Sequence, residues 1–351
     1  FVDFFVLGEG EEVTLEYIAL YRRARDEDWT KEELLREAAR IPGIYVPSFY
    51  EPVYRPDGTL EEMRIREGSG APELVRKRVV EDMNKSYFPV KTIIPSTEIV
   101  HDRVMLELFR GCIRGCRFCQ AGYVYRPVRS RSPELLAQYG KAACEDSGYQ
   151  EMTLSSLSST DYPCLLELCD DLLDYCAPRD IGLSLPSMRA DTFSMNLMER
   201  LQRVRKGGLT FAPEAGTQRL RDAINKNLRE EDLLQSVRTA FTGGWNGVKL
   251  YFMLGLPTET EEDIRGIAEL SNKIAALFFE TVPREKRTGQ VQIVASTSFF
   301  IPKPFTPFQW AKMSTKEEFL EKAHLTKTAI REQLNQKRIK YNWHEADVSV
   351  L

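Results

Sequence analysis

Strand-like and helix-like segments alternate with regular spacing from residue 104 onward, and this alternation constrains the fold more than any other feature of the chain. Parallel strands cannot be joined by a tight turn and need a crossover, which is usually a helix. Repeated strand and helix units therefore predict an α/β protein with a parallel sheet, arranged as an open or partial barrel. The expected strands are 104–109, 151–157, 182–185, 209–212, 248–254 and 291–296, and the expected helices are 133–146, 164–176, 193–204, 231–241 and 261–279.

The segments on either side of the alternating region have a different character. The chain opens on a strand-like run, 1–7, and a helical stretch, 14–25, and a strand at that point would lack its sheet partners. We therefore expect an upstream Rossmann-like domain that contains a parallel sheet. The predicted organisation is 1–25 as the tail of that upstream domain, 26–100 as an irregular bridging region, 101–311 as the barrel core and 312–351 as a C-terminal helical extension.

The composition is that of an ordinary globular protein and excludes several functional classes. Of the 351 residues, 42% are hydrophobic and 28% charged, and no apolar run approaches the roughly 20 residues that a membrane helix needs. The formal net charge of −4 argues against a protein that is basic over its whole surface, as many nucleic-acid binders are. Seven cysteines without a secretion signal are atypical of a disulfide framework, so a cytoplasmic location is expected.

Three cysteines in the loop after the first expected barrel strand form a Cys-x3-Cys-x2-Cys array, which comprises Cys112, Cys116 and Cys119. Loops at the carboxyl ends of parallel strands are the usual ligand sites of such a fold. Three thiolates on a short loop can occupy three corners of a [4Fe-4S] cubane and leave the fourth iron open to a substrate. Gly111 and Gly115 allow the backbone to wrap closely around such a cluster.

Zinc is the main alternative ligand of this loop. Structural zinc is normally four-coordinate, so a fourth protein ligand would be needed. His101 precedes the strand and Cys144 lies on the helix expected at 133–146, so neither is well placed to supply it. A loop of buried cysteines without any metal is the third alternative. A zinc site would indicate a zinc-stapled, non-catalytic binding protein, whereas an open iron indicates an enzyme.

The cysteine array has an aromatic residue, Phe118, directly before its third cysteine, and in this it resembles the cluster loop of the radical S-adenosylmethionine (SAM) superfamily. The resemblance implies a partial (β/α)6 TIM-like barrel, and SAM bound to the open iron through its amino and carboxylate groups. It also implies one-electron reduction of SAM, with release of methionine and a 5′-deoxyadenosyl radical. The electron would come from a donor such as flavodoxin or ferredoxin.

The loops after the next three expected strands contain candidate SAM contacts. The resemblance implies that the serine-rich loop 155–159 binds the SAM amino group, and we expect Ser156 and Ser158 to contribute; a capping or turn role is the alternative. The resemblance assigns Glu214 to the ribose hydroxyls of SAM. Arg189 could bind a carboxylate through paired hydrogen bonds. For both charged residues, a structural ion pair is the alternative.

The turn after the fifth expected strand contains Gly255 and Pro257, which permit a close approach of the backbone. This turn resembles the adenine-binding turn of the superfamily. Phe118 is a second candidate for contact with adenine, and packing in the core is its alternative reading. Lys303, in the proline-rich segment after the last expected strand, could face the barrel cavity.

The resemblance extends, through residues 1–25 and 100–310, to a bacterial subgroup with an upstream cobalamin-binding-like domain. The segment 5–11 resembles the end of that domain, which makes the tail predicted for 1–25 cobalamin-binding-like. Cobalamin is therefore a further candidate cofactor, although its ligand motif would lie upstream of residue 1. Methylthiotransferases share the barrel but carry a second cluster on N-terminal cysteines, whereas residues 1–111 contain no cysteine.

The remaining cysteines and a group of arginines complete the candidates. Four cysteines fall on expected helices and are interpreted as buried, small apolar residues: Cys144, Cys164, Cys169 and Cys176. Between Leu108 and Pro133 there is no acidic residue, but there are six arginines, 110, 114, 117, 126, 129 and 131. They could offset the negative charge of the cluster and SAM, or they could bind RNA or another anionic substrate.

Overall fold

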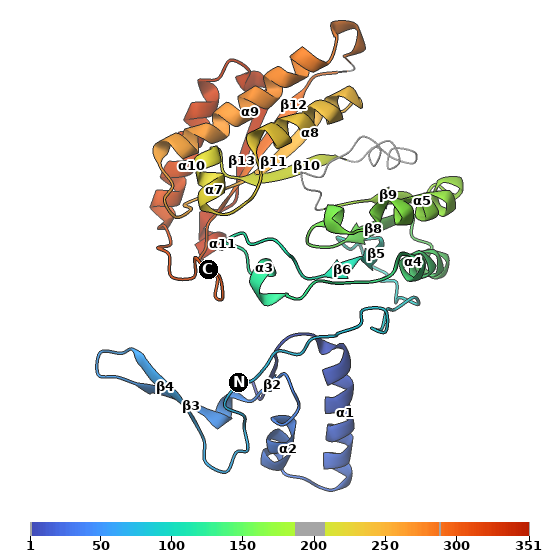
Figure 1. Cartoon of the computed structure of the whole chain (residues 1–351), viewed down its shortest axis with the longest axis vertical. Coiled ribbons are helices and arrows are strands. Elements are labelled where there is room, and N and C mark those ends of the chain that lie inside the picture. The colour runs from blue at the N-terminus through green and yellow to red at the C-terminus, as the bar shows by residue number, and fades with distance from the viewer. Residues whose placement is uncertain (1, 187–207, 288, 351) are drawn as a thin grey trace. The chain divides into compact units, whose positions relative to one another are not determined.

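The computed structural model of the chain describes residues 2–186, 208–287 and 289–350. The chain divides into two compact units, residues 1–88 (unit 1) and 89–351 (unit 2), and Figure 1 shows the elements of each. Among the helices in the three described ranges, none combines the length and the apolar character that a membrane crossing requires.

Unit 1 is built around two helices, α1 (Gly10–Asp26) and α2 (Lys31–Ala38). A capping box begins α2: the Thr30 hydroxyl accepts from the Glu33 backbone N–H, and the Glu33 carboxylate accepts from the Thr30 N–H. Because both bonds satisfy groups that have no partner inside the helix, the sequence Thr-x-x-Glu determines where this short helix begins.

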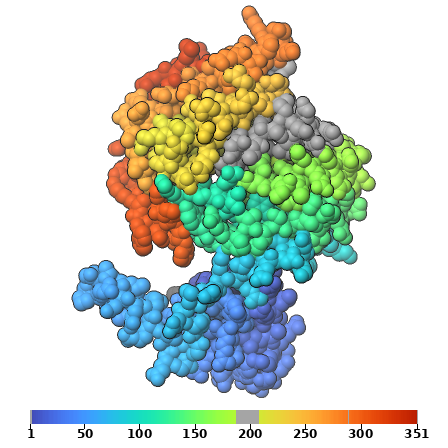
Figure 2. All heavy atoms as spheres, viewed as in Figure 1, coloured from blue at the N-terminus to red at the C-terminus, as the bar shows by residue number. Residues whose placement is uncertain are grey.

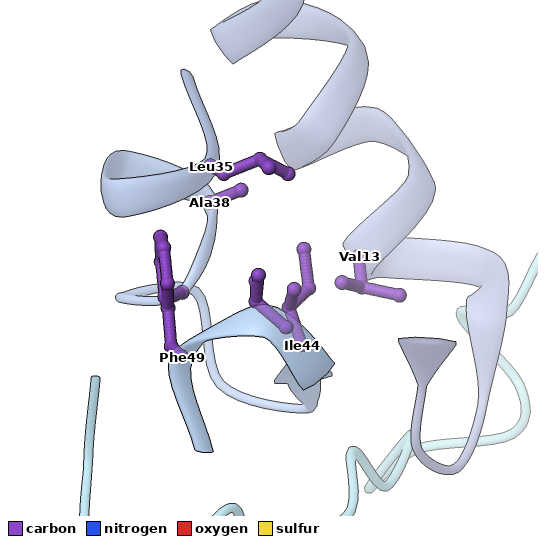
Figure 3. Packing of buried hydrophobic residues seen from close by; sticks show 7 residues of the cluster. Val13, Leu35, Ala38, Ile44 and Phe49 are labelled. Carbon is purple, nitrogen blue, oxygen red and sulfur yellow. The ribbon is translucent and has the colours of Figure 1, made fainter. Parts of the chain in front are cut away.

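A buried apolar cluster joins the helices of unit 1 to the segment that follows them (Figure 3). Val13 of α1 and Leu35 of α2 pack there with Ile44 and Phe49, which are all at most 9% exposed. The core therefore unites residues from the predicted upstream tail with residues from the predicted bridging region. The four-part organisation expected from the sequence stays a prediction.

Short strands complete unit 1. They form two antiparallel pairs: β1 (Phe5–Val6) with β2 (Ile44–Tyr45), and β3 (Tyr50–Tyr54) with β4 (Leu60–Ile65). Arg78 ties the end of the unit back to α1, because its guanidinium contacts Glu12 at 2.8 Å and Glu16 at 2.6 Å.

Parallel strands form two sheets in unit 2, which confirms the predicted α/β class (Figure 1). One sheet has the order β5-β8-β9 and the other the order β10-β11-β12-β13, and every neighbouring pair within them is parallel. The strands are β5 (Val104–Glu107), β8 (Glu151–Ser155), β9 (Gly182–Ser184), β10 (Leu209–Glu214), β11 (Gly247–Leu254), β12 (Gln292–Phe299) and β13 (Ile339–Trp343).

Helices connect these strands, and those at 133–147, 165–176, 230–242 and 261–281 lie where the sequence predicted them, whereas the short helix Gln218–Ala223 was not predicted. Their apolar faces are buried, as the amphipathic spacing of each segment requires. The predicted helix 193–204 lies outside the described residues. The connecting helices are α4 (Pro133–Ser147), α5 (Leu165–Cys176), α7 (Gln218–Ala223), α8 (Glu230–Thr242) and α9 (Glu261–Thr281).

The C-terminal segment differs from the expected helical extension. It contains the helices α10 (Lys316–Arg331) and α11 (Ala346–Val350), but also β13, which extends the second sheet beside β12. Ile339 and Tyr341 face the helices while Lys340 faces away, so this strand has the period of two residues that strands show. This strand pattern covers only five residues and follows the longer pattern of α10, so the sequence favoured a helical extension throughout.

Candidate active site

The three-cysteine loop follows β5 and is closed by a small antiparallel pair, β6 (Phe109–Arg110) with β7 (Arg129–Ser130). Gly111 opens the loop with φ of +100°, and a Cβ atom there would lie 2.4 Å from the carbonyl oxygen of Tyr125. At Gly122, in the short helix α3 (Ala121–Val124), a Cβ atom would lie 2.0 Å from the carbonyl oxygen of Arg114. The backbone is thus folded so closely on itself that both positions need glycine.

Residues at the end of α7 anchor the cysteine loop. The Asn225 side-chain amide donates to the carbonyl oxygen of Gly115 at 2.7 Å, and the Tyr123 hydroxyl donates to the same oxygen at 3.0 Å. The backbone N–H of Arg117 donates to the carbonyl oxygen of Ile224 at 2.9 Å. In Figure 2 the loop, in teal, lies beside the yellow atoms of this region. The loop is therefore attached to the segment that follows β10.

The thiols of the loop are only partly exposed. Cys116 is 8% exposed, Cys112 and Cys119 are half-buried, and the backbone N–H of Arg114 donates to the Cys112 sulfur at 3.4 Å. Burial raises the pKa of the neighbouring Tyr123 phenol, and the nearby Cys116 and Cys119 add to this effect. An N–H directed at a sulfur favours the thiolate, which is the form that binds metals.

The three sulfur atoms are carried on one loop, but their side chains do not converge. In the described ranges, no group of three or more His, Cys, Asp or Glu side chains has an arrangement that could hold a metal ion. The donor set itself, three thiols on one short loop, fits three corners of a [4Fe-4S] cluster with one open iron, whereas structural zinc normally takes four protein ligands.

The arginines of this region are used within the fold. Two pair with carboxylates: Arg110 with Glu107 at 2.8 Å, and Arg114 with Asp161 at 2.5 Å. Three others donate to backbone carbonyl oxygens, namely Arg117 to Ala223, Arg126 to Ile113 and Arg129 to Pro127, and Arg131 is buried near the Tyr139 ring. A carbonyl oxygen does not neutralise the positive charge of a guanidinium group. The three arginines bonded to carbonyl oxygens therefore stabilise the loop and also supply positive potential beside the thiols.

The serine loop after β8 contains a buried hydroxyl that has no partner among the described residues. Ser156 donates to the Ser159 hydroxyl at 3.0 Å, and Ser159 donates to the carbonyl oxygen of Pro186 at 2.8 Å. Ser158 is 3% exposed, and its hydroxyl finds no hydrogen-bond partner in the described part of the chain. Buried polar groups are nearly always bonded, so Ser158 is an exception, and its predicted contact with SAM stays a prediction.

Glu214 lies at the end of β10 in a backbone conformation that is rare for glutamate. Its φ is +68°, and the register with β11 shifts between Phe211 and Glu214. The carboxylate pairs with Lys226 at 3.0 Å, and the two side chains are 16% and 13% exposed. The structure shows the ion pair that was the alternative reading, and the predicted contact with ribose stays a prediction. Strained, partly buried positions of this kind are frequent at functional sites.

The turn after β11 is held by a buried carboxylate that the sequence analysis did not single out. The Gly255 backbone N–H donates to both oxygens of Glu259, at 3.0 and 2.9 Å, and Lys322 of α10 contacts the same carboxylate at 2.7 Å. Burial raises the pKa of Glu259, whose side chain is 3% exposed. Gly255 has φ of +83°, and a Cβ atom there would lie 2.6 Å from the Phe319 ring. Pro257 of this turn is half-buried.

Phe118 packs against a buried cluster that joins the strand-end loops. The cluster combines Ala215 after β10, Leu256 after β11 and Phe300 after β12 with Leu220 and Ile224. This packing brings the cysteine loop and the turns after three strands to one place. The packing role of Phe118 is confirmed, while its contact with adenine stays a prediction.

The remaining predictions concern Arg189, Lys303 and four further cysteines. Arg189 is outside the described residues, and Lys303 is exposed. Cys144, Cys169 and Cys176 are buried as expected, whereas Cys164 is only half-buried and precedes α5 instead of lying within it. Burial raises the pKa of Cys144 and of Cys176 to about 11.

Comparison with known proteins gives the family. Residues 106–271 match the model described as the radical SAM superfamily, and residues 1–47 match the model for the N-terminal region of radical SAM proteins. An uncharacterized protein of Methanocaldococcus jannaschii is 37% identical over 231 residues, which cover 65% of this chain and 48% of that protein. The threonylcarbamoyladenosine tRNA methylthiotransferase MtaB of Bacillus subtilis is 22% identical over 237 residues, 63% of this chain and 48% of that protein.

A solved structure shares the fold. The radical SAM methyltransferase TsrM from Kitasatospora setae, with cobalamin and a [4Fe-4S] cluster bound, aligns with a TM-score of 0.55 at 14% identity, over 88% of this chain and 53% of that one. The two family matches, of which the longer includes the cysteine loop, define a protein of the radical SAM class. The chain belongs to the radical SAM superfamily, whose enzymes use SAM and an electron donor. It spans about half the length of the curated relatives it matches.

Proposed function

We propose that the chain holds a [4Fe-4S] cluster on Cys112, Cys116 and Cys119 and reductively cleaves SAM to start radical chemistry. The observation that carries this proposal is the construction of the loop: three thiols on one short segment, and a backbone fixed by close contacts at Gly111 and Gly122. When bound, such a cluster would supply one electron to the sulfonium of SAM, so that a carbon–sulfur bond would break into methionine and a 5′-deoxyadenosyl radical.

The residues of the chain would bind and orient SAM. The Ser158 hydroxyl, which has no partner among the described residues, would accept from the SAM amino group, and Ser156 of the same loop would contribute. Glu214 would accept from the ribose hydroxyls in exchange for part of its contact with Lys226. Gly255 and Pro257 would present the backbone to adenine, and Phe118 would border that site. Arg189 would bind the SAM carboxylate.

The zinc-stapled binding protein finds no support in the family matches, which include the region of the cysteine loop. The electron donor would be a flavodoxin or a ferredoxin, acting in the cytoplasm. A cobalamin-binding-like domain upstream is a second part of the proposal, and a relative in shape, TsrM, is a cobalamin-bound enzyme. RNA is a candidate substrate because one relative modifies tRNA, although residues 1–111 contain no cysteine for a second cluster.

The experiment is anaerobic iron–sulfur reconstitution of the chain and of single Cys→Ala variants at positions 112, 116 and 119. The parent should bind about four irons and absorb broadly near roughly 400 nm, and each variant should lose that absorbance. Cys169→Ala, which alters a buried thiol in α5, serves as the control and should keep the cluster. Stoichiometric zinc and no iron chromophore in the parent would contradict the proposal.

A further inference from the structure

The sheet β10 to β13 has one face buried against helices and one polar face. On β11, Val248, Leu250 and Phe252 point to the helices and are at most 2% exposed. Side chains alternate along a strand, so Lys249 and Tyr251 point to the opposite face. Consistent with this, the Lys249 ammonium lies 4.9 Å from the centroid of the Tyr251 ring.

The strand register brings a second lysine to this face. Lys249 pairs with Val294 of β12, and Val294 pairs with Lys340 of β13. Residues paired in a parallel sheet share a face, and neighbouring strands lie about 4.8 Å apart, so the Cα atoms of the two lysines are about 10 Å apart. The next row along the strands contains hydrogen-bonding groups. We call the following six residues the lysine face: Lys249, Tyr251, Val294, Ser296, Lys340 and Asn342.

The two positive charges of the lysine face have no acidic residue opposite them on the neighbouring strands. Glu214 is the only acidic residue in the four strands, and it pairs with Lys226. Within the described ranges, neither Lys249 nor Lys340 has an ion pair or a hydrogen bond from its ammonium group. Two ammonium groups on one side of a sheet, with Tyr, Ser and Asn side chains beside them, are the groups that bind a phosphate or a carboxylate.

Protection of a sheet edge explains one of these lysines but not the other. Lysines are common on edge strands because they discourage pairing with another chain, and Lys340 lies on the edge strand β13. Lys249 lies on β11, which has β10 on one side and β12 on the other. A half-buried lysine in the middle of a sheet has no such role, and among the described residues its ammonium is accompanied by the Tyr251 ring and by no carboxylate.

We propose that the lysine face binds the phosphate or carboxylate group of a small anionic substrate. This inference rests on the proposed function. It places the substrate on one face of the sheet β10 to β13, and the proposed SAM contacts Glu214 and Gly255 lie at the carboxyl ends of two strands of that sheet. Lys249 precedes Gly255 by six residues, about 20 Å along an extended strand. The anionic group would therefore anchor an elongated substrate at a distance from the carbon that reacts.

The test measures anion binding without requiring the cluster. Inorganic pyrophosphate and citrate, which represent phosphates and carboxylates, are titrated calorimetrically into the cluster-free parent, Lys249→Gln, Lys340→Gln and the double variant. Each single change should weaken the binding of the preferred anion about threefold to tenfold, and the double change should weaken it further. The anion that binds more tightly identifies the class of substrate group.

A matched control separates a site from general attraction. Lys337 is an exposed lysine in the same unit without an ion pair in the described ranges, so Lys337→Gln should bind as the parent does. Circular dichroism should show the same fold for all variants. The proposal is overturned if the parent binds neither anion, or if Lys337→Gln weakens binding as much as Lys249→Gln. Because no reductant or SAM is present, either result is independent of whether the chain cleaves SAM.

Discussion

The side-chain amide of Asn225 donates a hydrogen bond of 2.7 Å to the carbonyl oxygen of Gly115, which lies 110 residues earlier in the chain. Asn225 follows α7 with φ of +54°, a conformation that asparagine tolerates better than most residues. This bond places the loop between Cys112 and Cys116 against the segment that follows β10, the strand that ends in Glu214. The cysteine loop and the chain that follows Glu214 are thus joined by a specific contact.

We predict that Asn225→Gly lowers the iron content after reconstitution. Glycine retains the positive φ without strain but removes the amide, so the Gly115 carbonyl loses a partner at a cost of about 1–2 kcal/mol. Iron content and urea unfolding would be measured beside the parent. Asn225→Ala should be less stable still, because it adds backbone strain. Full iron content in Asn225→Gly would show that the contact does not organise the loop.

For Glu214 we predict a loss of SAM affinity that its ion-pair partner does not share. A carboxylate that accepts from two ribose hydroxyls forms charge-assisted bonds, so Glu214→Ala should weaken SAM binding about tenfold to a hundredfold while the cluster remains. Lys226→Met breaks the same ion pair and is the matched control. Equal SAM affinity in the parent and Glu214→Ala, or equal losses in both variants, would make Glu214 a structural residue only.

The Glu259 carboxyl should make stability depend on pH. Burial raises its pKa in the folded state above the usual value of 4.5, so the folded chain binds the proton more tightly than the unfolded chain. This group therefore favours folding as the pH falls toward 4.5 and opposes it as the pH rises through the folded pKa. Urea unfolding of the parent and Glu259→Gln from pH 5 to 8 should show the parent losing stability relative to the variant as the pH rises. Parallel curves would contradict this.

The buried thiols should react far more slowly than those of the cysteine loop. With a pKa of about 11, Cys144 and Cys176 are thiolates in only about one molecule in a thousand at pH 8. Iodoacetamide labelling of the cluster-free native chain, followed by peptide mass spectrometry, should modify Cys112 and Cys119 first. Labelling of Cys144 at the same rate would mean that α4 opens readily.

The sequence predicted the parts of the structure that depend on local patterns. The alternation of strands and helices required parallel pairing, and the cysteine spacing required a loop at a strand end, because both follow from chain geometry. The contacts of Asn225 with Gly115 and of Glu259 with Lys322 join residues 110 and 63 positions apart, and no single-sequence pattern reports such pairs. Strand β13 was missed because five alternating residues are a weak signal beside α10.

Formation of 5′-deoxyadenosine tests the central claim most directly. The reconstituted parent, reduced with dithionite and supplied with SAM, should form 5′-deoxyadenosine and methionine in equal amounts, as measured by liquid chromatography and mass spectrometry. Cys112→Ala, Cys116→Ala and Cys119→Ala should form none, whereas Cys169→Ala should retain the activity. A parent that binds about four irons and SAM but forms no 5′-deoxyadenosine, or product from the three loop variants, would contradict the account.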